Sequence, residues 1–356
     1  MKKFLAILIF IFPLLVLSQK MTREQQLKIY KAFNQAQLYL EKDEIDKSQK
    51  WLNTTRDLID IQDVDTMSCY INSLQSELFY YTGLYEFGKT QAQKSINEAA
   101  KLVDSLLMAD AYFFRGINQF ELKDYHLAEQ SLQQAKKFYP QKPRLNTLKN
   151  VIRPDHIANN LAQAKLKINQ PDSALYYNRK AYRYAQKTNS RRGIPNCEQT
   201  FGEIYLSQKQ PDSAQYYFAQ SIRSAQHSKY YDLLLIGYGF LMECQPSEAS
   251  KAENYYQAGC KLMQTQSINL AFRKIFFQKA LIAFKGRQPE KENYILSQII
   301  RLNQETSDLN NYYLQSITKG YIQNERKILS LEVQRLKKEK DIVLLQLAVT
   351  IFFVLA

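Results

Sequence analysis

Polar breaks separate stretches of this chain in which small and apolar residues recur at helical spacing. Ala174 and Ala181 lie seven residues apart, as do Ala214 and Ser221, and residues seven apart share one face of an α-helix. Both stretches begin with Gln-Pro-Asp-Ser. There, proline suits a first helical position, and Asp and Ser offer acceptors to the open N–H groups of a helix start. The pattern predicts two equivalent helices, within residues 170–186 and 210–226.

A second, upstream helix accompanies each of these predicted helices. Twelve positions before the landmark alanine stands another small residue, Ala162 in one copy and Gly202 in the other. Small residues at matching offsets let two antiparallel helices approach closely. Weaker copies of the pair recur every 36 to 46 residues; their landmarks are Ser48, Ala92, Ala128, Ala174, Ala214, Ala252 and, weakly, Glu292.

The clearest copy, "YFFRGINQFELKDYHLAEQSLQQAKKFYP" at residues 112–140, resembles the tetratricopeptide repeat (TPR). Gly116, Ala128, Ala135 and Pro140 stand at the offsets of that two-helix repeat. The resemblance implies an all-α fold over residues 19–308, a TPR-type α-solenoid in which about six or seven helical hairpins form a right-handed superhelix. A non-repeating helical bundle is the alternative.

The resemblance also implies a concave groove, lined by the first helix of each pair, that binds a protein or peptide partner. Polar residues on two predicted first helices are the candidates for ligand binding: Asn159, Gln163, Gln199 and Glu203. For each of them an ordinary solvated position is the alternative. The Tyr-Tyr pairs at 176–177, 216–217 and 255–256 are interpreted as core filling between stacked helices, with ligand stacking as the alternative.

Residues 309–341 are predicted to form one long linking helix. Ile322, Leu329, Leu336 and Val343 recur every seven residues along it, which suits a short coiled coil and a homodimer through this helix. Three residues after each of the first three lies a glutamate, at positions where a second apolar row would belong. A solvated helix that does not dimerise is therefore the alternative.

The two ends of the chain predict export and a membrane anchor. Residues 1–18, with Lys2 and Lys3 before an apolar run, read as a signal peptide. Residues 342–356 contain only Gln346 and Thr350 as polar residues and are predicted to be a transmembrane helix, although a span needs about 20 residues. The predicted location is a periplasmic repeat domain anchored in the inner membrane.

Charge and cysteine content narrow the function further. The formal net charge is +14, but the basic residues are spread thinly, so we expect no direct nucleic-acid binding. The four cysteines, at 69, 197, 244 and 260, form no CxxC pair and no zinc-ligand spacing. They are expected to be small buried residues, and a disulfide between Cys244 and Cys260 is left open.

No catalytic motif is found in the sequence. The three histidines, at 126, 156 and 227, lie far apart, and Gly237-Tyr-Gly239 stands inside a helical stretch without the context of a phosphate loop. We therefore expect no catalytic residue, no metal site and no cofactor, and a chain that is not an enzyme.

The order of leader, TPR array, charged helix and apolar tail resembles a group of bacterial envelope regulators. The two "QPDSA" units, "KDYHLAEQSLQQAKKFYP" and "ILSLEVQRLKKEKDIVLLQLAVTIFFVLA" carry that resemblance. It implies an exported TPR sensor whose cytoplasmic output is a helix-turn-helix domain or a histidine kinase, and this sequence stops where that output would begin. The expected function is a non-enzymatic, membrane-tethered scaffold or sensor. The sensor half of such a regulator is the alternative.

Overall fold

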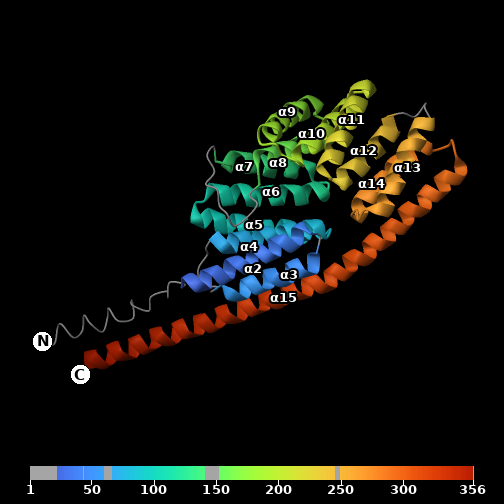
Figure 1. Ribbon diagram of the computed structural model, residues 1–356. Helices are drawn as coiled ribbons and strands as arrows, with labels where there is room; N and C mark the ends of the chain where they lie inside the picture. Colours follow the sequence, from blue (N-terminus) through green and yellow to red (C-terminus); the bar gives the residue numbers. More distant parts are fainter. Residues whose placement is uncertain (1–21, 43, 60–65, 141–151, 245–248, 356) are drawn as a thin grey trace. The chain divides into compact units, whose positions relative to one another are not determined.

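The structure is a computed structural model that describes residues 22–42, 44–59, 66–140, 152–244 and 249–355. Every regular element in these ranges is an α-helix, as Figure 1 shows, so the all-α prediction is confirmed. The chain divides at Asp60 into two compact units, each described by itself below. The predicted signal peptide, residues 1–18, lies outside the described residues.

The first unit is a single helical hairpin. It consists of α2 (Arg23–Glu41) and α3 (Ile45–Leu58). Thr22 and Gln25 form a capping box at the start of α2, in which each side chain bonds the backbone N–H of the other residue. The hairpin buries Phe33 and Leu52 completely, and the Ser48 hydroxyl donates to the carbonyl of Ala36 across the helix crossing.

The second unit stacks helix pairs and ends in one long helix (Figure 1). Its described elements, in chain order, are α4 (Thr66–Tyr81), α5 (Tyr85–Leu102), α6 (Ser105–Glu121), α7 (Tyr125–Phe138), α8 (Pro154–Lys167), α9 (Pro171–Lys187), α10 (Gly193–Ser207), α11 (Pro211–Ser228), α12 (Tyr231–Cys244), α13 (Ala249–Thr265), α14 (Leu270–Phe284) and α15 (Pro289–Leu355).

The landmark residues of the predicted repeats lie in the second helix of each pair, and their side chains are buried. These residues are Ser48, Ala92, Ala128, Ala174, Ala214 and Ala252. The last predicted landmark, Glu292, is half-buried on α15 instead. The predicted register of the helix pairs is therefore right for all landmarks except the one that the sequence marked as weak.

At each of the two Gln-Pro-Asp-Ser stretches the chain turns from one helix into the next, and the backbone conformation of the preceding residue makes the turn. Asn169 and Lys209 both adopt a left-handed conformation with φ of 59°, and a proline then opens the next helix. The N-caps, Gln170 and Gln210, make no side-chain cap bond. The predicted capping by Asp and Ser is thus not seen; the aspartates instead lie in the first turn, where the helix macrodipole favours a negative charge.

Gly202 shows why the repeat needs a small residue in its first helix. A Cβ atom at this position would lie 2.4 Å from Cε1 of Phe218, whose ring is completely buried between α10 and α12. The ring stacks on that of Phe240 at a centroid distance of 4.5 Å. The glycine therefore makes room for the aromatic ring that joins one helix pair to the next.

α15 begins earlier than the predicted linking helix, at Pro289 rather than at 309. Its first turns pack on α14, where Ile295 and Leu302 are completely buried in a core that also contains Phe276. They thus take the place of the second helix of a last pair. The helix then continues without interruption through residues 309–341 to Leu355.

Farther along, side chains of α15 contact the first pair of the second unit. The Tyr321 hydroxyl donates to Oε1 of Gln91 at 3.0 Å, and its ring packs edge-on against Phe79. Lys94 reaches the Tyr321 hydroxyl at 3.0 Å and Glu325 at 2.9 Å. A single helix therefore contacts both the last and the first helix pairs of this unit.

The prediction of an inner-membrane anchor at residues 342–356 was wrong. In the part of the chain that the structure describes, no helix is both long and apolar enough to cross a membrane. Within the described residues, the helix that contains the apolar run carries Lys338, Glu339, Lys340 and Asp341 directly before it.

All four cysteines are free thiols, so the Cys244–Cys260 disulfide left open by the sequence is not formed. Three of them are buried, as expected. Burial raises the pKa of the Cys197 thiol, and the nearby negative charges of Asp155 and Glu198 raise it further. Because the thiolate is the reactive form, burial of Cys197 disfavours a reactive thiol at this position.

Candidate functional site

Asn159, the first predicted ligand residue, lies inside the protein. Its side chain is 2 % exposed, and its amide donates to Oδ1 of Asn178 at 3.0 Å and to Oγ1 of Thr200 at 2.9 Å. Its carbonyl oxygen accepts from Asn196 at 2.8 Å. These partners come from α9 and α10, so Asn159 connects three helices and has no face left for a ligand.

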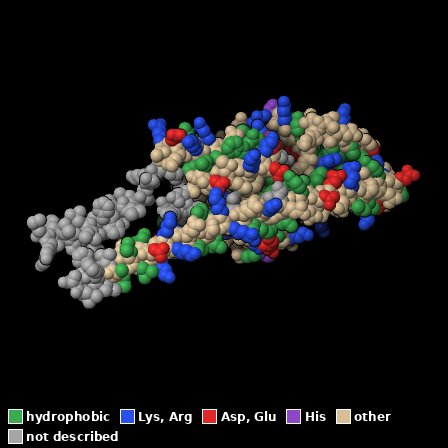
Figure 2. Space-filling view, turned by 90° about the horizontal axis from the view of Figure 1, so that it is seen from below, with side chains coloured by type: hydrophobic (Ala, Val, Ile, Leu, Met, Phe, Trp, Pro, Cys, Tyr) green, Lys and Arg blue, Asp and Glu red, His purple; other side chains and the backbone are tan. Residues whose placement is uncertain are grey.

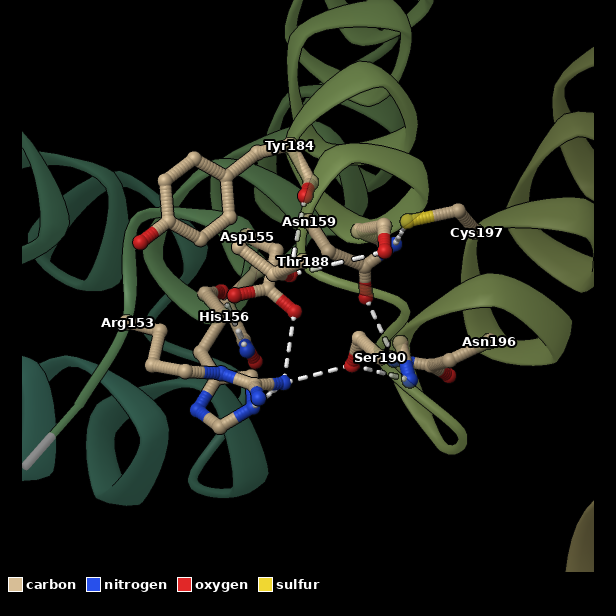
Figure 3. A network of polar contacts seen from close by, with 12 residues as sticks. Arg153, Asp155, His156, Asn159, Tyr184, Thr188, Ser190, Asn196 and Cys197 are labelled. Carbon is tan, nitrogen blue, oxygen red and sulfur yellow. Dashed lines mark hydrogen bonds and ion pairs between the residues drawn. The ribbon is translucent and has the colours of Figure 1, made fainter. Parts of the chain in front are cut away.

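Asn159 belongs to a larger polar network at the starts of α8 and α10, which Figure 3 shows. The guanidinium of Arg153 donates from Nη2 to Oδ2 of Asp155 at 2.9 Å and to Oγ of Ser190 at 2.5 Å. The same nitrogen lies 3.3 Å from Nε2 of His156. Ser190 in turn accepts from the backbone N–H of Gly193 at 3.0 Å. The network fixes two helix starts against each other.

His156 is the titratable base of this network. Burial lowers its pKa, the positive charges of Arg153 and Arg192 lower it further, and Asp155 opposes them. The neutral ring is therefore favoured in the folded protein. With one buried carboxylate and the guanidinium of Arg153 bonded to it, the arrangement orders the starts of α8 and α10.

Gln199 and Glu203, two other predicted residues, lie one turn apart on α10. Nε2 of Gln199 donates to Oε1 of Glu203 over a long distance of 3.4 Å. Oε1 of Gln199 is buried and has no hydrogen-bond partner in the described part of the protein. Loss of solvent raises the pKa of the half-buried Glu203 carboxyl. Within the described residues, α10 thus carries an unpartnered buried acceptor beside a carboxylate that forms no ion pair.

Charged side chains from three neighbouring first helices act on Glu203. Lys167 of α8 and Lys279 of α14 lower its pKa, whereas Glu243 of α12 raises it. Lys279 and Glu243 form an ion pair of 2.6 Å in which both side chains are about one-fifth exposed. We call Lys167, Glu203, Glu243 and Lys279 the charged row. Gln163, the fourth predicted residue, is half-buried on α8.

The charged row thus includes one predicted residue, Glu203, and three that sequence reasoning missed. Lys167, Glu243 and Lys279 are carried by first helices, as the prediction requires of groove residues, but they stand near the ends of α8 and α12 and within α14. Glu203 stands 11 residues before its landmark Ala214, whereas Lys167 stands 7 before Ala174 and Glu243 stands 9 before Ala252. The repeat pattern therefore does not mark Lys167 and Glu243 as equivalents of Glu203.

One Tyr of each of two predicted core pairs is exposed. Tyr176 and Tyr216 are 52 % and 58 % exposed, while Tyr177 and Tyr217 pack inward. Tyr176 borders a shallow depression on α9 that is lined by Asp172, Leu175, Tyr176, Arg179, Lys180 and Arg183. None of the four predicted ligand residues lines this depression, which lies on a second helix.

The surface carries charges of both signs. In the face that Figure 2 shows, Lys and Arg side chains alternate with Asp and Glu side chains and do not merge into one basic patch. Among the described residues, no group of three His, Cys, Asp or Glu side chains is placed to hold a metal ion.

Comparison with known proteins connects this arrangement to TPR-type folds. No family model and no curated relative matches the sequence. Among solved structures, a Rap protein complexed with Competence and Sporulation Factor has a TM-score of 0.62 and 12 % identity, over 82 % of this chain and 78 % of that chain.

Two further solved structures agree. Aspartyl phosphate phosphatase F from Bacillus subtilis has a TM-score of 0.51 and 15 % identity, over 87 % of this chain and 95 % of its own. A STAND protein with a tetratricopeptide repeat sensor from Pyrococcus horikoshii has a TM-score of 0.54 and 13 % identity, over 83 % of this chain and 45 % of its own. These neighbours are TPR-type helical repeat proteins, so the TPR-type fold is confirmed. At such low sequence identities the similarity shows a shared fold and no shared function.

Proposed function

We propose that this chain is a non-enzymatic TPR-type scaffold that binds an extended peptide or protein segment along α8, α10, α12 and α14. The observation that carries the proposal is Oε1 of Gln199, a buried acceptor that has no partner among the described residues and lies next to the Glu203 carboxyl. A buried acceptor without a partner costs about 1–3 kcal/mol, and a ligand that donates a hydrogen bond to it removes that cost.

The charged row defines the chemistry of the ligand. A backbone N–H of an extended segment reaches Oε1 of Gln199 once that side chain turns toward the ligand, and a Lys or Arg side chain pairs with Glu203. Lys279 is already paired with Glu243 at 2.6 Å, so Glu203 is the carboxylate that a ligand cation reaches without displacing a close ion pair. The Rap neighbour was solved with a bound factor, which supports a binding role for the fold. The phosphatase activity in the name of the second neighbour is a property of that protein and is not part of this proposal.

A sensor role extends this proposal. α15 contacts both α14 and the α4–α5 pair, through Ile295 at one end and Tyr321 farther along. A rearrangement of the helix pairs on binding would therefore displace α15. An output domain of the helix-turn-helix or histidine-kinase type, encoded in the same or another chain, would receive that displacement.

Gln199→Leu and Glu203→Gln are expected to weaken binding of basic peptides selected on the full chain from a random peptide library. Loss of one ordinary hydrogen bond raises Kd about two- to tenfold, and loss of the charged acceptor raises it about tenfold or more. Fluorescence anisotropy with a selected peptide measures both changes.

Gln257→Leu is the matched control for this test. Gln257 donates to Glu253 one turn away, as Gln199 does to Glu203, but it is exposed on a second helix, α13. Its replacement should leave Kd unchanged. Equal Kd values for wild type, Gln199→Leu and Glu203→Gln, or a library that yields no binder, would remove the site.

Binding is expected to strengthen as pH rises through the pKa of Glu203. That pKa is raised above 4.5 in the folded protein, mainly by burial, so the carboxyl is still protonated where an exposed glutamate has already ionised. A ligand cation needs the ionised form, and affinity gains up to about tenfold per pH unit until Glu203 is fully ionised. Titrations from pH 4.5 to 8 show the gain, and Glu203→Gln should flatten it. A flat wild-type profile contradicts the assignment of Glu203.

A further inference from the structure

The part of α15 that follows Glu325 carries an apolar line that nothing in the described residues covers. Every described side chain from Leu329 to Ala348 is exposed. Leu329, Leu336 and Val343, spaced by seven, are 60 %, 58 % and 56 % exposed. Contiguous exposed apolar surface of this kind marks a contact with another macromolecule.

Glu325, Glu332 and Glu339, each three residues after an apolar residue of this line, are compatible with a coiled coil when the apolar residues are assigned to heptad position d. In a heptad abcdefg, a position four residues after d is the next a, and a position three after d is g. With Ile322, Leu329, Leu336 and Val343 at d, the glutamates occupy g, where charged residues are normal, and Lys337 occupies e. The a positions are then Arg326, Val333, Lys340 and Leu347.

We propose that residues 322–347 of α15 form a parallel two-stranded coiled coil with a second copy of this chain. At 1.5 Å per residue the seam is about 39 Å long. Glu332 at g of one copy faces Lys337 at the following e of the other, an opposite-charge pair. An antiparallel pair would instead place g against g, so that Glu325, Glu332 and Glu339 of the two copies would repel one another.

The polar a positions select the number of strands. A lysine at a costs stability but favours two strands, because its long stem reaches past the seam and keeps the ammonium in water. Lys340 is such a lysine, and the a positions before and after it are the apolar residues Val333 and Leu347. The occupant is therefore a single second copy.

The mass of the full chain in solution tests the dimer. Sedimentation equilibrium should give twice 41.8 kDa, and Leu329→Asp with Leu336→Asp should raise the dimer dissociation constant at least tenfold. Leu331→Asp is the matched control: Leu331 is also exposed but lies at f, away from the seam, so its dimer should be unchanged. Both variants change only exposed side chains, and circular dichroism confirms the same helix content.

Charge exchange and cross-linking test the parallel register. Glu332→Lys should weaken the dimer, and adding Lys337→Glu should restore it. In a Cys260→Ser background, Leu336→Cys should form a disulfide-linked dimer under oxidation, whereas Lys338→Cys, at f, should not. A monomer at all concentrations, a trimer, or seam and control variants with equal dissociation constants would overturn the proposal.

Discussion

Phe218→Ala is expected to lower the free energy of unfolding of the second unit by about 3–5 kcal/mol. The side chain is completely buried, and its ring is stacked on Phe240 at 4.5 Å. It comes from α11 and lies against Gly202 of α10, so the ring fills the space between two helix pairs. In a solenoid each pair contacts only its neighbours, so loss of this ring weakens one interface.

Urea unfolding followed by circular dichroism measures the total effect, and hydrogen exchange of α10 and α12 measures it locally. Tyr216→Ala is the matched control, because this aromatic residue of the same helix is 58 % exposed and its loss should cost far less. Gly202→Ala should destabilise the wild type, since the new Cβ meets the Phe218 ring at 2.4 Å, but should be tolerated in Phe218→Ala. Equal effects of Phe218→Ala and Tyr216→Ala would contradict this account.

The repeat was predictable because close helix crossings leave a local mark on the sequence. Ala174, Ala214 and Gly202 are small because a neighbouring backbone or ring occupies the space of a larger side chain. The partner that imposes the small residue was not predictable. Phe218 and Phe240 are 22 positions apart and belong to different pairs, and a single sequence does not reveal which aromatic ring fills which gap.

The candidate site was predictable only in part. Polar residues on a first helix either face a ligand or bond with one another inside, and helical spacing is the same for both. The amide of Asn159 is satisfied inside the protein by Asn178, Asn196 and Thr200, whereas Oε1 of Gln199 has no partner among the described residues. That difference depends on side chains brought together from three helices.

The prediction of a membrane segment at residues 342–356 was wrong because it considered the hydropathy of that run without the charged residues that precede it in the same helix. The run from Ile342 is apolar, yet it continues a helix that carries Lys338, Glu339, Lys340 and Asp341. The beginning of α15 at Pro289 was hidden for a different reason. The first turns of α15 bury Ile295 and Leu302 as a second repeat helix would, so the sequence shows a weak repeat and no boundary.

Arg153→Ala is expected to cost more stability than Asp155→Ala, although both break the same ion pair. The Asp155 side chain is 1 % exposed, and Oδ1 has no hydrogen-bond partner among the described residues. Removal of Arg153 leaves a buried carboxylate without its cation, which costs about 3–5 kcal/mol. Removal of Asp155 leaves a guanidinium whose side chain is 38 % exposed and can be hydrated, so the cost is smaller.

A double-mutant cycle in urea unfolding tests this asymmetry. Asp155→Asn keeps an acceptor for Arg153 but removes the charge, so Arg153→Ala should cost much less in an Asp155→Asn background than in wild type. Arg301→Ala is the control: the Arg301–Glu305 pair is 54 % and 43 % exposed, and its loss should cost less than about 1 kcal/mol. If Asp155→Ala proved the more damaging change, stabilisation of the buried Asp155 charge would not be the main contribution of the Arg153 guanidinium.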